Sequence, residues 1–229
     1  MRKSLIRLPL LFTLLLIALT LTSQLSAYGI NAAEKVYRDV NNSVFMIFDI
    51  HNKDYKNPID FGSGVAVTKN ILATNCHVAL KGDERIIKIH DKYVTATLVY
   101  KDEVDDICLL KVPQNNLTPV KLRKSTSVRI GEEVFTIGSP KGYEKSISRG
   151  IISNKIDFKN TSILQTDAAI SPGSSGGGLF DTKSNLIGIT FLKNEASGSE
   201  GIGFALPTEL IAKLVNQLDL DSNNDIKMA

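Results

Sequence analysis

The sequence predicts an all-β protein built from two lobes, with one short helix before them and one helix after them. Short runs rich in β-branched and aromatic residues follow one another from residue 43 to residue 207. Turn-forming stretches such as NKDYKNP, KGD and DK separate these runs, and no helical periodicity lies between them. Strands at this density favour an antiparallel sandwich or barrel.

Six runs predict the strands of the first lobe, which we place at residues 34–120. A short helix over NAAEKVYRDV precedes them, with Val36, Tyr37 and Val40 on one stripe. In chain order the runs are SVFMIFDI (43–50), GSGVAVT (62–68), ILATNCHV (71–78), ERIIKIH (84–90), YVTATLVY (93–100) and ICLLKV (107–112).

A second set of six runs predicts the other lobe, at residues 121–219, after the proline-containing connection PQNNLTPVKLRKSTSV. These runs are EVFTIGS (133–139), SISRGIIS (146–153), SILQTDA (162–168), GGLFD (177–181), LIGITFL (186–192) and GIGFALP (201–207). The stretch PTELIAKLVNQL then predicts a helix that starts at Pro207 and Thr208 and has one apolar face. We expect residues 220–229 to form a polar, frayed tail.

The first 27 residues have the order of a secretory signal peptide. MRKSLIR is basic, Leu8 to Leu25 is mostly apolar, and the small residues of SAYG follow, which favours cleavage after Ala27 or Gly29. The apolar stretch is near the length of about 18 residues at which a membrane span forms, so an uncleaved anchor over residues 8–25 is the alternative. Either interpretation predicts export, to the periplasm of a bacterium or to the medium.

Charge and cysteine content exclude several partners. The formal net charge is +3, and the first 27 residues supply it through Arg2, Lys3 and Arg7 without any acid. The remainder is therefore neutral and has no basic stripe of the kind that nucleic-acid binding requires. Two cysteines are too few for a cysteine-built zinc site. We expect no metal and no cofactor.

The stretch SPGSSGGGLFD (171–181) is the first candidate for chemistry. It lies between two β-rich runs, so it is a turn in a folded domain rather than a linker. Glycines let successive backbone N–H groups converge on one spot, and a serine hydroxyl beside such donors forms half of an acyl-transfer site. The other half is a base that takes the proton of the hydroxyl.

Three histidines are candidates for this base. His90 alternates with Lys88 on a polar face and His51 lies in a polar turn, so we interpret both as solvated. His77 instead closes the apolar run ILATNCHV. On burial alone a structural histidine and a catalytic one both remain open. An imidazole that becomes a cation needs a carboxylate, and Asp106, directly before the apolar ICLLKV, is the carboxylate that we expect to be drawn inward.

Four motifs, TNCHV, DDICLLKV, QTDAAISPGSSGG and GIGFALP, occur in this order. Together they resemble the HtrA (Deg) family of chymotrypsin-fold serine proteases, and the likeness extends from about Glu34 to Leu218. The order His, Asp, Ser is the one that this fold uses, whereas an α/β-hydrolase esterase has the order Ser, Asp, His on a parallel sheet. The resemblance implies two six-stranded antiparallel β-barrels and an exported serine endopeptidase that processes or removes proteins or peptides. The alternative is a chaperone or binding module on the same fold with little or no catalysis.

The resemblance implies a role for each matching residue. Ser175 is the expected nucleophile, His77 the general base and later the general acid, and Asp106 the residue that orients the imidazole. The oxyanion hole is expected in the backbone of Gly173, Ser174 and Ser175, chiefly in the N–H groups of Gly173 and Ser175. Digestive relatives carry an Asp at position 174, where it pairs with a newly cut N-terminus, so Ser174 predicts that activation by clipping is absent.

Specificity and assembly follow less directly from the resemblance. Ala169 is expected at the base of the primary pocket, Phe191, Leu192 and Lys193 on one wall, and Gly203 near the floor. We therefore expect cleavage after small or medium apolar residues. HtrA proteases typically carry a PDZ module after the protease domain, and this sequence ends just past its helix, so we expect the protease domain alone, as a monomer or a trimer.

Cys76 and Cys108 flank the expected catalytic pair. Cys76 precedes the base, and Cys108 lies two residues after Asp106, so the two segments approach each other if His77 meets Asp106. In an exported protein this favours a disulfide. Two small buried thiols are the alternative.

Overall fold

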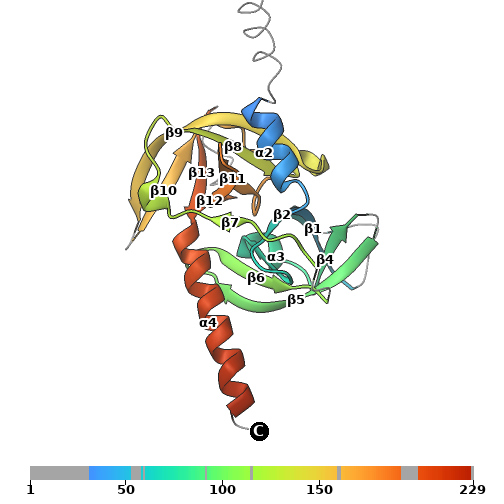
Figure 1. Cartoon of the computed structure of the whole chain (residues 1–229). Helices are drawn as coiled ribbons and strands as arrows, with labels where there is room; N and C mark the ends of the chain where they lie inside the picture. Colours follow the sequence, from blue (N-terminus) through green and yellow to red (C-terminus); the bar gives the residue numbers. More distant parts are fainter. Residues whose placement is uncertain are drawn as a thin grey trace, which may run out of the picture.

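The computed structural model describes residues 31–52, 58, 60–90, 92–113, 116–158, 161–191 and 201–227, and the side chains within them except at 161 and 219–227. Two β-barrels lie side by side, with helix α2 (Ala32–Val40) and helix α4 (Thr208–Lys227) packed on them (Figure 1). The predicted signal segment at residues 1–27 lies outside the described part. None of the described helices is long and apolar enough to cross a membrane.

Six antiparallel strands close the first barrel in the order β1-β2-β3-β6-β5-β4. Their interior is an apolar cluster that includes Ile47, Leu72 and Leu110, all fully buried. The strands are β1 (Val44–Ile50), β2 (Asp60–Ala66), β3 (Ile71–Thr74), β4 (Glu84–Ile89), β5 (Lys92–Asp102) and β6 (Ile107–Lys111). The prediction of a continuous strand over 71–78 is wrong, because β3 ends at Thr74 and the short helix α3 (Cys76–Ala79) follows.

The second barrel also has six antiparallel strands, in the order β11-β8-β9-β10-β13-β12, and the pairing of β11 with β12 closes it. The prediction of two six-stranded barrels is confirmed. The strands are β8 (Glu133–Gly138), β9 (Ser146–Phe158), β10 (Thr161–Thr166), β11 (Gly178–Asp181), β12 (Asn185–Phe191) and β13 (Gly203–Pro207). A two-residue strand that the sequence did not predict, β7 (Lys121–Leu122), adds a parallel edge to β12.

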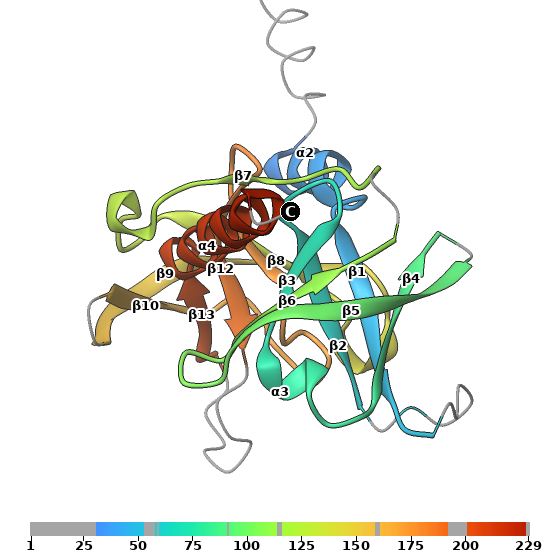
Figure 2. The same cartoon turned by 90° about the horizontal axis from the view of Figure 1, so that it is seen from below.

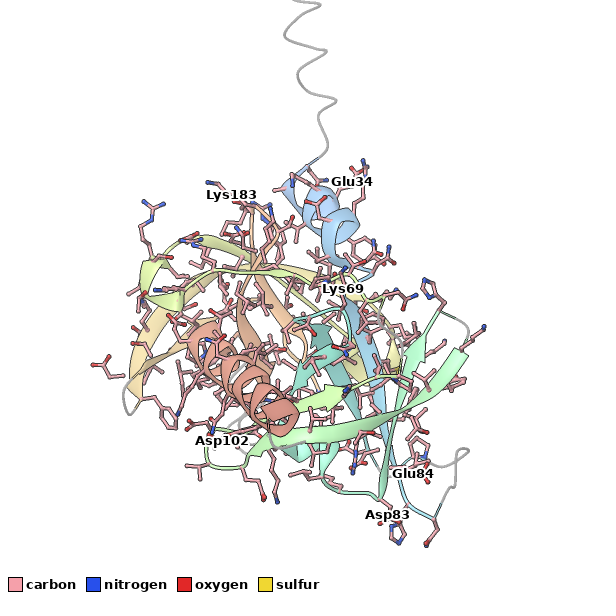
Figure 3. The ribbon with its side chains drawn as sticks, turned by 60° about the horizontal axis from the view of Figure 1, so that its bottom comes forward. Glu34, Lys69, Asp83, Glu84, Asp102 and Lys183 are labelled. Carbon is pink, nitrogen blue, oxygen red and sulfur yellow. A yellow bond between two sulfur atoms is a disulfide. The ribbon has the colours of Figure 1, made fainter. Side chains whose placement is uncertain are left out.

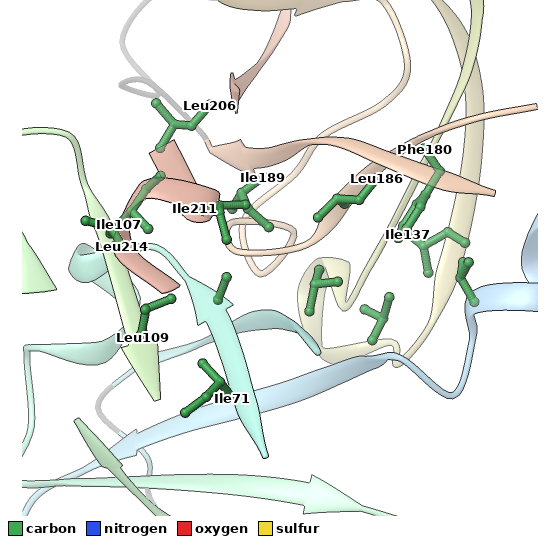
Figure 4. Close-up of a cluster of buried hydrophobic side chains, with 14 of the residues drawn as sticks. Ile71, Ile107, Leu109, Ile137, Phe180, Leu186, Ile189, Leu206, Ile211 and Leu214 are labelled. Atoms are coloured by element: carbon green, nitrogen blue, oxygen red, sulfur yellow. The ribbon is translucent and has the colours of Figure 1, made fainter. Parts of the chain in front are cut away.

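A separate apolar cluster joins the two lobes. Figure 4 shows Ile71 and Leu109 of the first lobe, Leu186 and Ile189 of the second, and Ile211 and Leu214 of α4 in this cluster. Burial of these apolar side chains, worth about 25 cal/mol per Å² of surface removed from water, holds the two lobes together.

Helix α4 extends across both lobes. It contacts β12 and β13 of the second barrel and β5 and β6 of the first (Figure 2). The Tyr100 hydroxyl on β5 donates to the side-chain oxygen of Gln217 at 3.2 Å. The backbone of α4 is helical as far as Lys227, so most of the predicted tail at 220–229 continues the helix.

Candidate active site

His77 lies on α3, which begins as soon as β3 ends. The backbone carbonyl of Asp106, just before β6, accepts hydrogen bonds from the side chain of Asn75 at 3.0 Å and from the N–H of Cys76 at 3.3 Å. Strand β3 also pairs with β6, with Thr74 opposite Cys108. The histidine segment is therefore docked directly on the segment that carries Asp106.

The carboxylate of Asp106 holds His77 at two points. Its Oδ2 lies 2.7 Å from His77 Nδ1, and its Oδ1 accepts the His77 backbone N–H at 3.0 Å. With Nδ1–H donating to an ionised carboxylate, Nε2 is the nitrogen left to accept a proton. Asp106 has a φ of 54°, a left-handed conformation that is uncommon for a residue other than glycine. Its side chain is 31% exposed, so it is partly buried.

A disulfide joins Cys76 to Cys108, as predicted. The Cα atoms are 4.9 Å apart, and both residues are buried. The bond crosslinks the residue before His77 to the residue two after Asp106. It therefore holds together the same two segments that the contact between the Asp106 carboxylate and His77 joins.

The other two histidines lie elsewhere, as the sequence indicates. His51 is more than half exposed, and its Nδ1 lies 2.7 Å from the carboxylate of Asp83, whose position before β4 is labelled in Figure 3. His90 is exposed at the turn between β4 and β5, with a φ of 53°.

The serine turn begins as a type II β-turn. The N–H of Ser174 donates to the carbonyl of Ser171 at 2.8 Å, with Pro172 and Gly173 at the two central positions. Gly173 has a φ of 93°, which this turn requires at its third residue and which glycine adopts without a Cβ clash. Because the Ser174 N–H closes the turn, it is not one of the converging donors, contrary to our inclusion of Ser174 in the predicted oxyanion hole.

The N–H groups of Gly173 and Ser175 each share a peptide with a carbonyl whose oxygen accepts hydrogen bonds. The Pro172 carbonyl accepts the N–H of Lys141 at 2.7 Å. The Ser174 carbonyl accepts the Thr190 hydroxyl at 2.7 Å and the Gly177 N–H at 2.9 Å. In a trans peptide the N–H points opposite to the C=O. The N–H groups of Gly173 and Ser175 are therefore aimed away from these anchored carbonyls.

Strand β2 brings the histidine segment and the serine turn together. A Cβ on Gly62 would lie 2.6 Å from the side chain of Val78 and 3.0 Å from the Ser175 carbonyl oxygen, so both segments approach its backbone closely. The N–H of the next residue, Ser63, donates to that same carbonyl at 2.8 Å. The segment of the first barrel that carries His77 and the turn of the second that carries Ser175 therefore both lie against β2.

The predicted pocket residues lie in part around Gly203. A Cβ on Gly203 would lie 2.6 Å from Ile170 Cδ1, so the Ile170 side chain crosses the place that the missing side chain leaves. Phe191 packs near Phe204, with ring centroids 6.0 Å apart. Ile170, which follows Ala169, was not predicted, although its apolar character beside the expected pocket base was a usable signal. Leu192 and Lys193 lie outside the described residues.

Within the residues that the structure describes, no group of three or more His, Cys, Asp or Glu side chains is arranged to hold a metal ion. The groups described at this location are one imidazole, one carboxylate and one serine hydroxyl, beside oriented backbone N–H groups. Sites that catalyse acyl transfer use these groups.

Two β-barrels that bring a His–Asp pair and a serine turn together define a protein of the chymotrypsin-fold serine protease class. Residues 62–189 match the family described as trypsin-like peptidase domain, and the chain belongs to that family. Its similarity to DegP-like relatives and to the structure of an HtrA-type protease supports an HtrA-type protease domain.

Curated relatives and solved structures agree with this. The chain is 37% identical over 164 residues to a probable periplasmic serine endoprotease DegP-like of Hahella chejuensis, covering 69% of this chain and 35% of that protein. A DegP-like relative of Pseudomonas putida is 38% identical over 167 residues, with 70% and 35% covered. This chain therefore spans about a third of the length of these relatives.

Two solved structures share the fold. The serine endoprotease from Yersinia pestis superimposes with a TM-score of 0.72 at 30% identity, covering 84% of this chain and 68% of that one. An HtrA-type protease, AlgW, with a tripeptide gives a TM-score of 0.71 at 31% identity, covering 80% and 62%.

Proposed function

We propose that this chain is the protease domain of an exported serine endopeptidase that cleaves proteins or peptides through Ser175, His77 and Asp106. The observation that carries the proposal is the double contact of the Asp106 carboxylate with His77, at 2.7 Å to Nδ1 and 3.0 Å to the backbone N–H. That contact fixes the imidazole in the orientation that proton transfer through Nε2 requires. The periplasm is the proposed location, because the DegP-like relatives are named periplasmic and the first 27 residues have the order of a signal peptide.

The reaction proceeds by general base and then general acid catalysis. Nε2 of His77 takes the proton of the Ser175 hydroxyl as Oγ attacks the carbonyl carbon of the scissile peptide bond. The proton then passes to the leaving nitrogen when the C–N bond breaks, which leaves an acyl group on Ser175. Water repeats the sequence, releases the acid and restores the serine. Asp106 stabilises the imidazolium in both halves and is not itself protonated.

The N–H groups of Gly173 and Ser175 bind the oxygen that becomes negative during attack. Each such donor is worth about 10²-fold or more in rate. Their direction is preset by the anchored carbonyls of Pro172 and Ser174, which accept hydrogen bonds at 2.7–2.9 Å. The serine turn therefore needs little rearrangement when the transition state forms.

Cleavage after a small or medium apolar residue is the proposed specificity. Ile170 crosses the space beside Gly203, and the pocket base at Ala169 offers no charge for a basic side chain. Phe191 and Phe204 add apolar surface nearby.

The alternative, a binding module or chaperone with little catalysis, is less well supported. It is expected to lack a member of the triad, and all three are present.

Labelling with a fluorophosphonate probe tests the proposal. We expect the folded wild type to be phosphonylated and Ser175→Ala to be unlabelled, because the probe reacts only with an activated serine. Ser174→Ala is the matched control: the Ser174 hydroxyl only accepts the Ser171 N–H at 3.3 Å, so labelling should persist. Equal labelling of Ser175→Ala, or none of the folded wild type, would favour the binding module.

A further inference from the structure

Ser63 on β2 connects the first barrel to the serine turn of the second. It is fully buried, at 0% exposure. Its hydroxyl donates to the Gly173 carbonyl at 2.8 Å, across 110 residues of sequence, and accepts the N–H of Ser139 at 2.8 Å. Its backbone N–H donates to the Ser175 carbonyl at 2.8 Å. One residue thus binds the turn on both sides of Ser174.

The hydroxyl acts on the most adaptable residue of the turn. Glycine occupies several backbone conformations at similar energy, so Gly173 needs external contacts to keep a φ of 93°. The peptide between Gly173 and Ser174 is bonded at both ends, its carbonyl by Ser63 and its N–H by the Ser171 carbonyl at 2.8 Å. Without the hydroxyl the carbonyl end loses this donor, and the Gly173 backbone is freer to rotate.

The same hydroxyl also accepts a hydrogen bond from the segment that holds the peptide before Gly173. Ser139, whose N–H donates to Ser63, directly precedes the short helix η2 (Pro140–Gly142). Lys141 in this helix holds the Pro172 carbonyl at 2.7 Å and thereby aims the Gly173 N–H. Both peptides that flank Gly173 are therefore tied to one hydroxyl, one directly and one through residues 139–141.

We propose that the Ser63 hydroxyl is a positioning group that keeps the Gly173 N–H aimed at the reacting oxygen. Ser63 is buried under the turn and does not touch substrate. The proposal rests on the proposed protease function. Because the oriented N–H matters chiefly in the transition state, removal of the hydroxyl lowers the rate of the chemical step and leaves ground-state binding nearly unchanged.

The experiment is saturation labelling of the full chain with a fluorophosphonate probe, since the phosphonyl oxygen needs the same donors. For Ser63→Ala we expect the limiting rate constant to fall about tenfold to a hundredfold. The probe concentration that gives half of this rate should stay the same. Ser63→Cys retains a weak donor of similar size and should give an intermediate rate constant.

Thr208→Val is the matched control. Thr208 is 2% exposed, and at the start of α4 its hydroxyl donates to the Arg123 carbonyl at 2.7 Å rather than to a group of the serine turn. Its loss removes a buried hydroxyl hydrogen bond without touching Gly173, so the limiting rate constant should match that of the wild type. A comparable fall in Thr208→Val would show a general structural effect and overturn the proposal.

The remaining outcomes separate the two proposals. A folded wild type that is not labelled contradicts the protease function itself. A labelled wild type together with folded Ser63→Ala that reacts at the same limiting rate contradicts only the role of Ser63. Loss of folded protein in both Ser63 variants would mean that the hydroxyl serves the fold as a whole, which also overturns a positioning role.

Discussion

The two barrels supply their halves of the site in different ways. The first barrel contributes side chains: the imidazole of His77, the carboxylate of Asp106 and a disulfide that braces them. The second contributes one hydroxyl on a turn whose backbone is held by hydrogen bonds to the carbonyls of Pro172 and Ser174. The contribution of the first barrel depends on which side chains it carries. The contribution of the second depends largely on the direction of its backbone N–H groups.

This difference predicts how each half fails. A side-chain site is damaged by changing the side chain, even when the backbone stays in place. A backbone site is damaged from a distance, because its anchors, Ser63 and Lys141, are remote in sequence from Ser175. Substitutions in the two barrels test this contrast.

Asp106→Asn should have the largest effect. Asparagine tolerates the left-handed φ of 54° at this position, so the backbone should be retained. The amide cannot stabilise the imidazolium and favours the wrong tautomer of His77, and such changes in Ser-His-Asp enzymes lower kcat about 10⁴-fold. Peptidase kinetics together with circular dichroism measure both points. Loss of folded protein, or activity within about tenfold of wild type, would contradict a purely side-chain role.

Removal of the disulfide should have the next largest effect. Cys76→Ala/Cys108→Ala opens a crosslink between residues 32 apart, which we expect to lower the free energy of unfolding by about 2–4 kcal/mol. Denaturant unfolding measures this loss. Labelling of Ser175 should persist in the folded fraction, because the carboxylate contacts of His77 do not involve sulfur. Intact mass should rise by about 2 Da on reduction of the wild type, and an unchanged mass would show that the bond is absent.

The sequence predicted much of the fold because strand composition and turn residues are local signals. Runs rich in β-branched and aromatic residues identified all six strands of each barrel, and the motifs around His77, Asp106 and Ser175 supplied the candidate residues for the triad. The structure confirms the barrels and the predicted contact between His77 and Asp106.

What the sequence missed depends on long-range contacts. Ser63 is one serine in a strand, and nothing local indicates that its hydroxyl meets Gly173, 110 residues later. The direction of the Ser174 N–H was equally hidden, since it follows from the closure of a turn. The end of β3 was misjudged because an apolar run such as ILATNCHV looks the same as strand or as short helix.

The smallest predicted effect is a difference between the two barrels in how the free energy of unfolding depends on pH. At the start of the second lobe, hydrogen bonds from Arg123 hold the pKa of Glu132 below its ordinary 4.5. A carboxyl with a lowered folded pKa stabilises the protein above its ordinary pKa, and this stability is lost as pH falls through the folded value. In the first barrel, burial raises the pKa of Asp49 above 3.8. Its contribution has the opposite sign: stability is lost as pH rises from the ordinary value through the raised one.

Glu132→Gln and Asp49→Asn should therefore differ from wild type in opposite pH ranges. We expect Glu132→Gln to lose on the order of 1 kcal/mol at neutral pH, and its deficit should shrink as the pH falls below the ordinary 4.5 and through the lowered folded pKa. The deficit of Asp49→Asn should instead grow in acid, where the wild-type carboxyl is protonated and stable in its buried place. Glu103→Gln, at a side chain that is 60% exposed, is the control, and its free energy of unfolding should follow that of the wild type at every pH. Urea unfolding across this pH range measures all three. If the deficits of Glu132→Gln and Asp49→Asn instead change with pH in the same direction, the two lobes do not differ in how they hold these carboxylates, and the contrast between the barrels is limited to the catalytic groups.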